Sequence, residues 1–273
     1  MRQKIRFSFI VVLAFTGLNA WTQQFQISCP LPFDTIKVQH EIDQTCPNEG
    51  PSNSTAAKKA EARAKNNFCA NGNAPIRLAF DSFERLQEAS DGLNVHPSQL
   101  TDRSVLQKLV TVHNDHVGEG SLVQYVAYVL DAHASNVQHG HSSKFGETVN
   151  CKRPTAEDND IHIVLGQDPQ EDPCESVTAE MSPHFRPDSW TPENLTAVRD
   201  HPVRITGQLF FDSSHHPCTD TSRASPPRAA VWEIHPVYQL EVCRGTSLGT
   251  CKHAPQGDWV PLNEWSQTET PDE

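Results

Sequence analysis

The chain has 273 residues, enough for one large domain or for one domain with a smaller appendage. Its formal charge is −12 at pH 7, and so acidic a chain is repelled by phosphate backbones, which disfavours general nucleic-acid binding. Fourteen histidines stand beside three tyrosines and two methionines, which suggests either metal binding or histidine-rich surface loops.

The N-terminus has the pattern of a secretory signal peptide. Arg2, Lys4 and Arg6 are followed by the apolar run FSFIVVLAFTGLNA, which is too short to cross a bilayer. We expect cleavage after Ala20, so that residues 1–20 are removed and the charge becomes −15. No later apolar run is long enough for a membrane span, and the mature protein is predicted to be secreted or periplasmic.

All eight cysteines follow this cleavage site, and they form no CxxC pair. An even number of cysteines in an exported chain favours disulfides over a thiolate metal site. Eight cysteines allow 105 pairings, so the connectivity stays open. Two short local loops are the best predictions, closed by Cys151–Cys174 and by Cys243–Cys251.

Residues 21–115 are predicted to form a small helical region tied by disulfides. Residues 21–52 are irregular, because proline, glycine and asparagine interrupt any periodicity. The segment that follows is rich in Ala, Lys, Glu and Arg, which are good helix formers, and Ser54 or Thr55 can cap it. Helices are expected at 56–68, 76–89 and 104–110.

From residue 116 the pattern changes to alternating apolar and polar residues, which is typical of strands buried on one face. Strands are predicted at 122–133, 160–165, 176–181, 203–211 and 231–242, with a short sixth strand near 257–262. A helix is expected from Thr191 to about Val198, with Thr191 as its cap and Pro192 in its first turn. These elements define a mainly β domain over 116–262, followed by an acidic tail over 263–273.

The order of three strands, one helix and two strands resembles the OB-fold, a five-stranded Greek-key barrel. This resemblance implies a barrel whose strand face and loops take oligosaccharides, peptides or nucleic acids. A β-sandwich is the alternative, but it needs more strands than the pattern supplies. The segments DNDIHI, AEMSPHFRP, VRITGQLFFD and VWEIHPV also resemble an exported bacterial family of unknown function, which implies no activity and no catalytic residues.

Polar residues on three of the predicted strands are candidates for chemistry. Asp160 and His162 share one strand face, as do Glu233 and His235, because side chains two residues apart point the same way. Imidazoles and carboxylates are ligands for zinc and other transition metals such as manganese, so these four residues are candidate metal ligands. Glu180, at the end of the third strand, is a candidate general base, and an open metal position would activate water for hydrolysis.

A structural interpretation competes with this one. Pairs such as Glu233 and His235 are more often cross-strand hydrogen-bond or charge pairs, and Pro236 indicates a bulge or a sheet edge. With Trp232 and Ile234 in the core, Glu233 and His235 are expected to point outward.

Other candidates lie in loops, and several familiar catalytic motifs are absent. His215 and His216 are expected in an exposed loop, where they are candidate ligand-binding residues. The sequence contains no HExxH, Walker or GxGxxG motif.

Two functions remain open from the sequence, with a third that predicts no ligand. The first is an exported module that binds an oligosaccharide, a peptide or a protein. The second is a metal-dependent hydrolase of the phosphodiesterase or nuclease type, with zinc or manganese held by the histidines and carboxylates above. The third is a structural or assembly factor of the cell envelope.

Overall fold

A computed structural model describes residues 24–27, 29–30, 36, 38–93, 96, 99–135 and 146–268. The predicted signal peptide lies outside these residues. The α-helices are α1 (Glu41–Thr45), α2 (Ala56–Lys65), α3 (Phe80–Asp91), α4 (Pro192–Ala197), α5 (Leu248–Cys251) and α6 (Leu262–Thr268). The strands are β1 (Asn71–Arg77), β2 (Val110–Val112), β3 (Asp115–Val117), β4 (Ser121–Ala134), β5 (Ile161–Gly166), β6 (Val177–Met181), β7 (Val203–Phe211), β8 (Trp232–Cys243) and β9 (Trp259–Pro261).

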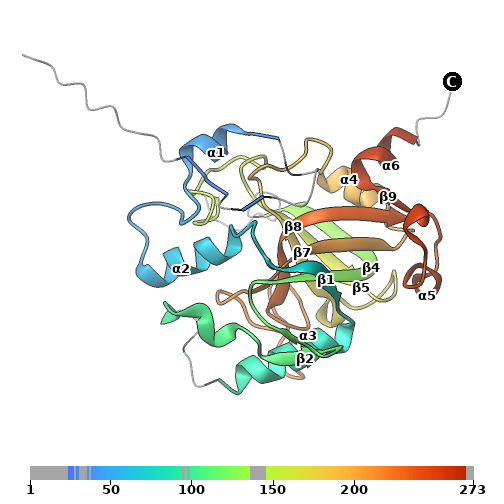
Figure 1. Cartoon of the computed structure of the whole chain (residues 1–273), viewed down its shortest axis with the longest axis horizontal. Helices are drawn as coiled ribbons and strands as arrows, with labels where there is room; N and C mark the ends of the chain where they lie inside the picture. The colour runs from blue at the N-terminus through green and yellow to red at the C-terminus, as the bar shows by residue number, and fades with distance from the viewer. Residues whose placement is uncertain are drawn as a thin grey trace, which may run out of the picture.

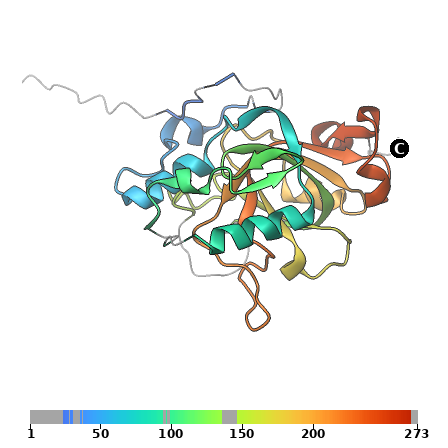
Figure 2. The same cartoon turned by 60° about the horizontal axis from the view of Figure 1, so that its bottom comes forward.

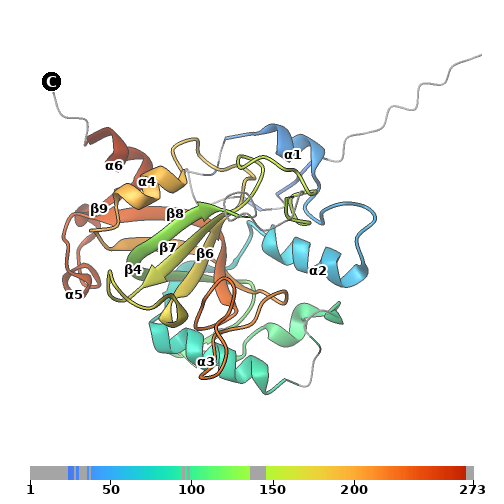
Figure 3. The same ribbon diagram turned by 180° about the vertical axis from the view of Figure 1, so that it is seen from behind.

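Five strands close into a barrel in the order β4-β5-β6-β8-β7, with β7 pairing back onto β4 (Figures 1 and 3). The β6–β8 pair is parallel and the other four pairs are antiparallel. The predicted helix between the third and fourth barrel strands is α4. The Thr191 side chain caps it by accepting a hydrogen bond from the Asn194 backbone N–H at 3.2 Å. The predicted closed barrel of five strands is therefore confirmed.

The chain is less strongly β than predicted, since strands exceed helices only modestly and the fold is mixed α/β. The segment before residue 116 also contains strands that the sequence pattern did not reveal. Strand β1 pairs in parallel with the barrel strand β4. Strands β2 and β3 form a hairpin beside α3 (Figure 2). The Arg85 guanidinium of α3 donates to the Thr111 carbonyl of β2. The N-terminal segment is thus built onto the barrel.

The barrel interior is filled by alternate residues of every strand, as period-two patterning requires. This core is formed by Val123, Tyr125, Ala127, Val129, Ile161, Ile163, Leu165, Val177, Ala179, Met181, Val203, Ile205, Leu209, Phe211, Trp232 and Ile234. Trp232 is fully buried, as predicted, and its indole N–H donates to the Ser90 hydroxyl of α3. Helix α3 therefore covers one end of the β8 core.

The predicted irregularity at Pro236 is present as a bulge between β7 and β8. Gly207 lies opposite Val237 and Leu209 opposite Ile234, so that two residues of β8 face one residue of β7. A Cβ atom on Gly207 would lie 2.5 Å from the Pro236 carbonyl oxygen, which explains why glycine occupies this position.

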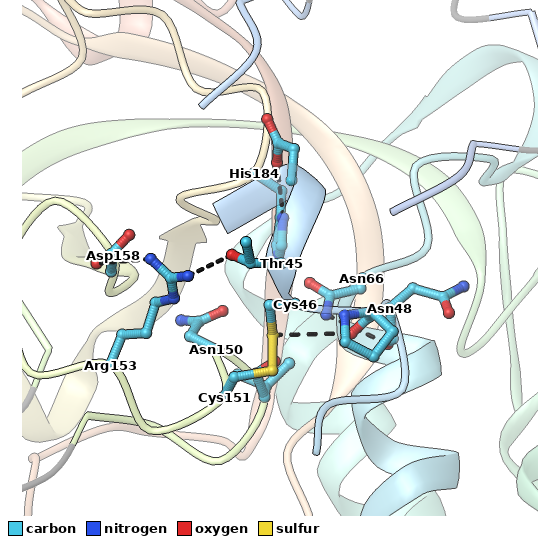
Figure 4. The surroundings of a disulfide bond; sticks show 12 residues. Thr45, Cys46, Asn48, Asn66, Asn150, Cys151, Arg153, Asp158 and His184 are labelled. Carbon is cyan, nitrogen blue, oxygen red and sulfur yellow. Dashed lines mark hydrogen bonds and ion pairs between the residues drawn. A yellow bond between two sulfur atoms is a disulfide. The ribbon is translucent and has the colours of Figure 1, made fainter. Parts of the chain in front are cut away.

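All eight cysteines are paired. The predicted Cys243–Cys251 bond is present, but the predicted Cys151–Cys174 bond is wrong. The four bonds are Cys29–Cys69, Cys46–Cys151, Cys174–Cys218 and Cys243–Cys251. Figure 4 shows how Cys46, just after α1, joins the loop that precedes β5, where the Arg153 guanidinium also donates to the Thr45 hydroxyl. Tertiary packing placed distant segments together, whereas the prediction considered only short loops.

The end of the chain is described only in part. The acidic tail expected over 263–273 begins as helix α6, which extends to Thr268, and residues 269–273 lie outside the described part. None of the described helices is both long enough and apolar enough to span a bilayer.

Candidate functional site

The candidate polar residues of β5, β6 and β8 lie together. His162 and Glu180 are direct partners in the β5–β6 register. Glu233 of β8 pairs with Thr178 of β6, whose side chain is on the same strand face as that of Glu180. Asp160 directly precedes β5, and His235 follows Glu233 on the same face of β8. These five residues and Lys65, the last residue of α2, form a group of six that we call the buried ionic cluster.

Glu180 is the centre of the buried ionic cluster. Its Oε2 atom lies 2.9 Å from the Lys65 ammonium and 2.7 Å from His235 Nδ1. Its Oε1 atom lies 3.2 Å from His162 Nδ1. Three donors therefore converge on one carboxylate, which fixes both histidine rings relative to β6.

Asp160, Glu180 and His235 each offer one ligand atom, and these three atoms lie within 4.8 Å of one another. This buried group could hold a metal ion. Several neighbouring polar atoms lack a hydrogen-bond partner among the described residues, namely Asp160 Oδ2, His162 Nε2, Glu233 Oε1 and His235 Nε2. A buried polar atom without a hydrogen bond costs about 1–3 kcal/mol, so these four atoms are the least satisfied part of the cluster.

Glu233 and His235 point away from the barrel core, as expected from their alternation with Trp232 and Ile234, but each has a relative exposure of 0%. The N-terminal segment and the loop before β5 cover this part of the barrel wall. Gln208 of β7 donates to the Ala64 carbonyl of α2, and the Asn150 amide donates to Asp160 Oδ1. Strand alternation correctly predicted which residues share a face, but not that a second layer covers it.

The electrostatics of the buried ionic cluster follow from burial and from opposed charges. Burial and Lys65 lower the pKa of His235, but Asp160, Glu180 and Glu233 outweigh them and raise it to about 10. Burial raises the pKa of the Glu180 carboxyl, but Lys65 and the two histidines hold it well below its usual range. Burial lowers the pKa of His162, so this imidazole is neutral at pH 7.

A chain of charged contacts connects the buried ionic cluster to the surface. Arg228 lies 3.4 Å from Glu233 Oε2 and 3.3 Å from Asp212 Oδ2. Asp212 in turn pairs with Nδ1 of His215, whose side chain is 37% exposed. His215 and His216 thus lie in a partly exposed loop, as expected, and not in the cluster. Their role as ligand-binding residues stays a prediction.

Sequence reasoning missed Lys65, Arg228 and Asp212. Lys65 ends a helix of the sequence AAKKAEARAK, in which three lysines and one arginine are equivalent by pattern. Arg228 lies in a proline-rich connection without periodicity. Only Asp212 carried a signal, because it is a carboxylate directly after the apolar strand VRITGQLFF.

A second candidate site, which we call the cationic pocket, lies where β1, β4 and β7 meet α5 and β9. It encloses about 240 Å³ and shares no residue with the buried ionic cluster. Figure 1 shows α5 at the opposite side of the barrel from α2. The pocket is lined by Arg77, Leu78, Ala79, His113, Gln124, Val126, Arg204, Cys251, Lys252, His253, Ala254 and Trp259.

The lining of the cationic pocket combines an apolar surface with positive charge. None of its lining residues is acidic, although the chain as a whole carries −12. Arg204 stacks on the Trp259 ring at 4.4 Å and pairs with Glu241, which leaves Arg77 and Lys252 as the exposed cations. The Arg77 side chain has no ion-pair or hydrogen-bond partner among the described residues.

Comparisons with protein-family models, with curated proteins and with solved structures found no match. The resemblance of DNDIHI and VWEIHPV to an exported bacterial family therefore stays a prediction.

Proposed function

We propose that this protein is an exported binding module of OB-like fold, and that the cationic pocket is its ligand site. Support for the fold comes from the strand order, the parallel β6–β8 pair and the position of α4 between β6 and β7. Support for export comes from the signal-like N-terminus and from four disulfides, which form and persist in oxidising compartments.

The observation that carries the proposal is an open pocket whose described lining pairs apolar surface with cations and no carboxylate. Ligand sites are concave and largely apolar, with a few polar groups that fix the orientation of the ligand. The usual OB ligand face, formed by the second and third strands, corresponds here to β5 and β6. The polar part of that face is covered by Lys65 at the end of α2 and by the loop before β5, which directs attention to the pocket on β4 and β7.

The chemistry of the lining favours a ligand that carries a carboxylate on a partly apolar body. The C-terminal end of a peptide and a uronic-acid oligosaccharide both present this chemistry. Arg77 would pair with the carboxylate, because a guanidinium matches it with two parallel hydrogen bonds. Trp259 and Val126 would contact the apolar part.

The test is a screen of the purified protein on peptide and acidic-glycan arrays, followed by calorimetric titration of the best binder. We expect Arg77→Gln to weaken binding about tenfold, which corresponds to the loss of one charge-assisted contact. Arg63→Gln, which removes an exposed arginine outside the pocket, is the matched control and should bind like the unaltered protein. Equal affinity of the Arg77→Gln variant, or preference for the amide of the ligand over its carboxylate, would contradict the proposal.

The second candidate function is a metal-dependent hydrolase centred on the buried ionic cluster, and the partnerless buried atoms there favour it. Asp160, Glu180 and His235 would hold zinc or manganese. Glu180 is a poor general base, because three donors stabilise its ionised form. His162 suits that role better, since it is neutral at pH 7 and its Nε2 atom has no partner among the described residues.

The burial of the cluster, which closes it to a substrate, makes hydrolysis the second candidate function. Catalytic metal sites keep an open position, whereas structural sites are closed, and Asp160 and His235 are at most 1% exposed. Elemental analysis of the purified protein tests the candidate, together with an assay on a phosphodiester substrate. One bound metal that is lost with His235→Ala, accompanied by turnover, would support hydrolysis, whereas a metal-free protein without turnover would exclude it.

A further inference from the structure

The position of Lys65 in the buried ionic cluster points to a property that the binding function does not require. Helix α2 ends at Lys65, whose ammonium lies 2.9 Å from Glu180 Oε2, 3.9 Å from Asp160 Oδ2 and 4.0 Å from Glu233 Oε1. The residue is 8% exposed. The Lys65 ammonium therefore lies among three carboxylates, one from each of three neighbouring segments of the barrel wall.

The ligand atoms around Lys65 have the composition and the spacing of a divalent-metal site. Zinc binds imidazole nitrogens and carboxylate oxygens at about 2.0–2.2 Å, so the ligands of a tetrahedral ion lie about 3–4 Å apart. His235 Nε2 and Asp160 Oδ2 are 3.7 Å apart, and neither has a hydrogen-bond partner among the described residues. The Nδ1 atom of His235 is held by Glu180 Oε2, which fixes the ring and leaves Nε2 on the side of Asp160.

Lys65 competes directly with any ion at this place. Its ammonium already uses Glu180 Oε2, and Glu180 is one of the three ligand residues. Two cations within a few ångström of each other repel strongly in a buried site, because little water is present to screen them. A divalent ion and the Lys65 ammonium therefore exclude one another.

We propose that Asp160, Glu180 and His235 form a divalent-cation site whose place in this chain is taken by the ammonium group of Lys65, so that metal enters only when Lys65 is withdrawn and the His235 ring gives up its proton. Lys65 in this role is a covalently attached counter-ion that also holds the end of α2 against the barrel. The inference stands apart from the proposed binding function, because the cationic pocket shares no residue with this site.

The experiment compares zinc binding by the mature protein and by its Lys65→Met variant, which keeps the length of the side chain and removes its charge. Lys58→Met is the matched control, because Lys58 lies on the same helix and is exposed. Each protein is equilibrated with zinc chloride, dialysed against metal-free buffer and analysed for zinc content and for thermal stability with and without zinc.

We expect the unaltered protein and Lys58→Met to retain no zinc, with no change of Tm on its addition. We expect Lys65→Met to retain one zinc per chain with a raised Tm, and to lose it when His235→Ala is added. A folded Lys65→Met protein without zinc would overturn the proposal. Stoichiometric zinc in the unaltered protein would overturn it as well, and would instead support the hydrolase candidate.

A variant that does not fold in metal-free buffer still gives a result. The denatured, disulfide-intact Lys65→Met protein is then refolded in parallel with zinc and with a chelator. Recovery of the native circular-dichroism spectrum only in zinc supports the proposal, because the ion replaces the missing ammonium. Failure to refold in either condition overturns it.

Discussion

The two disulfides Cys46–Cys151 and Cys243–Cys251 are predicted to stabilise the fold by different amounts, because they close loops of very different length. The partners are 105 residues apart in the first bond and 8 apart in the second. In the chain-entropy treatment, a loop of about 100 residues contributes about 4.7 kcal/mol, and the same expression gives about 2.5 kcal/mol for a loop of about 8 residues. Replacing both cysteines of the long-range bond by alanine should therefore cost about 2 kcal/mol more than replacing both cysteines of the short one.

Urea denaturation of the two double-alanine variants and of the unaltered protein, followed by circular dichroism, measures this difference. The short-range pair is the comparison, because Cys243 and Cys251 are buried like Cys46 of the long-range pair, whereas Cys151 is half-buried. Equal losses of stability, or a larger loss from the short-range pair, would refute the reasoning. That result would mean that local packing outweighs the entropy of the unfolded chain.

Three further predictions concern single residues. The pKa of His235 is raised to about 10 in the folded protein, against 6.5 when unfolded, so it adds stability that is complete below pH 6.5 and is lost as the pH rises to 10. The free energy of unfolding, measured by urea titration across this range, should therefore fall less in His235→Gln than in the unaltered protein. Gly207→Ala should lower Tm, because the new methyl group would lie 2.5 Å from the Pro236 carbonyl oxygen. Gly257→Ala is the control, because its methyl group would meet nothing within 4 Å. Equal Tm values of the two variants in calorimetry would contradict the prediction. Arg103→Met should lower the free energy of unfolding by about 3–5 kcal/mol in urea denaturation, because it leaves the buried Glu119 carboxylate uncompensated. Arg223→Met breaks an exposed pair and should cost less than about 1 kcal/mol. Similar costs would argue against buried charge as the cause.

Local pattern was sufficient for the barrel strands, because a strand buried on one face alternates along the chain. The expected strand at 203–211 coincides with β7, and DIHIVL matches β5 to within one residue. Capping chemistry is equally local, and Thr55 and Thr191 accept the hydrogen bonds expected of them. Strand β1 escaped prediction because NGNAPIR has no alternation, and its order comes from pairing with β4.

The candidate site was only partly determined by the sequence. Period two placed Glu233 and His235 on one face and Asp160 and His162 on another, and the β5–β6–β8 pairing brought those faces together. The sequence did not determine that α2 would cover this face, since a polar strand face normally meets water. Nor could it single out Lys65, because every charged residue of a surface helix looks alike in pattern.

By itself, then, the sequence determined the strands, the caps and the residues that share a face, since these depend on neighbours within a few positions. Tertiary structure decided the long-range disulfide partners, the burial of the ionic cluster and the choice of Lys65 as its cation. Each of these depends on which distant segments pack together, and many different packings satisfy the same local periodicity.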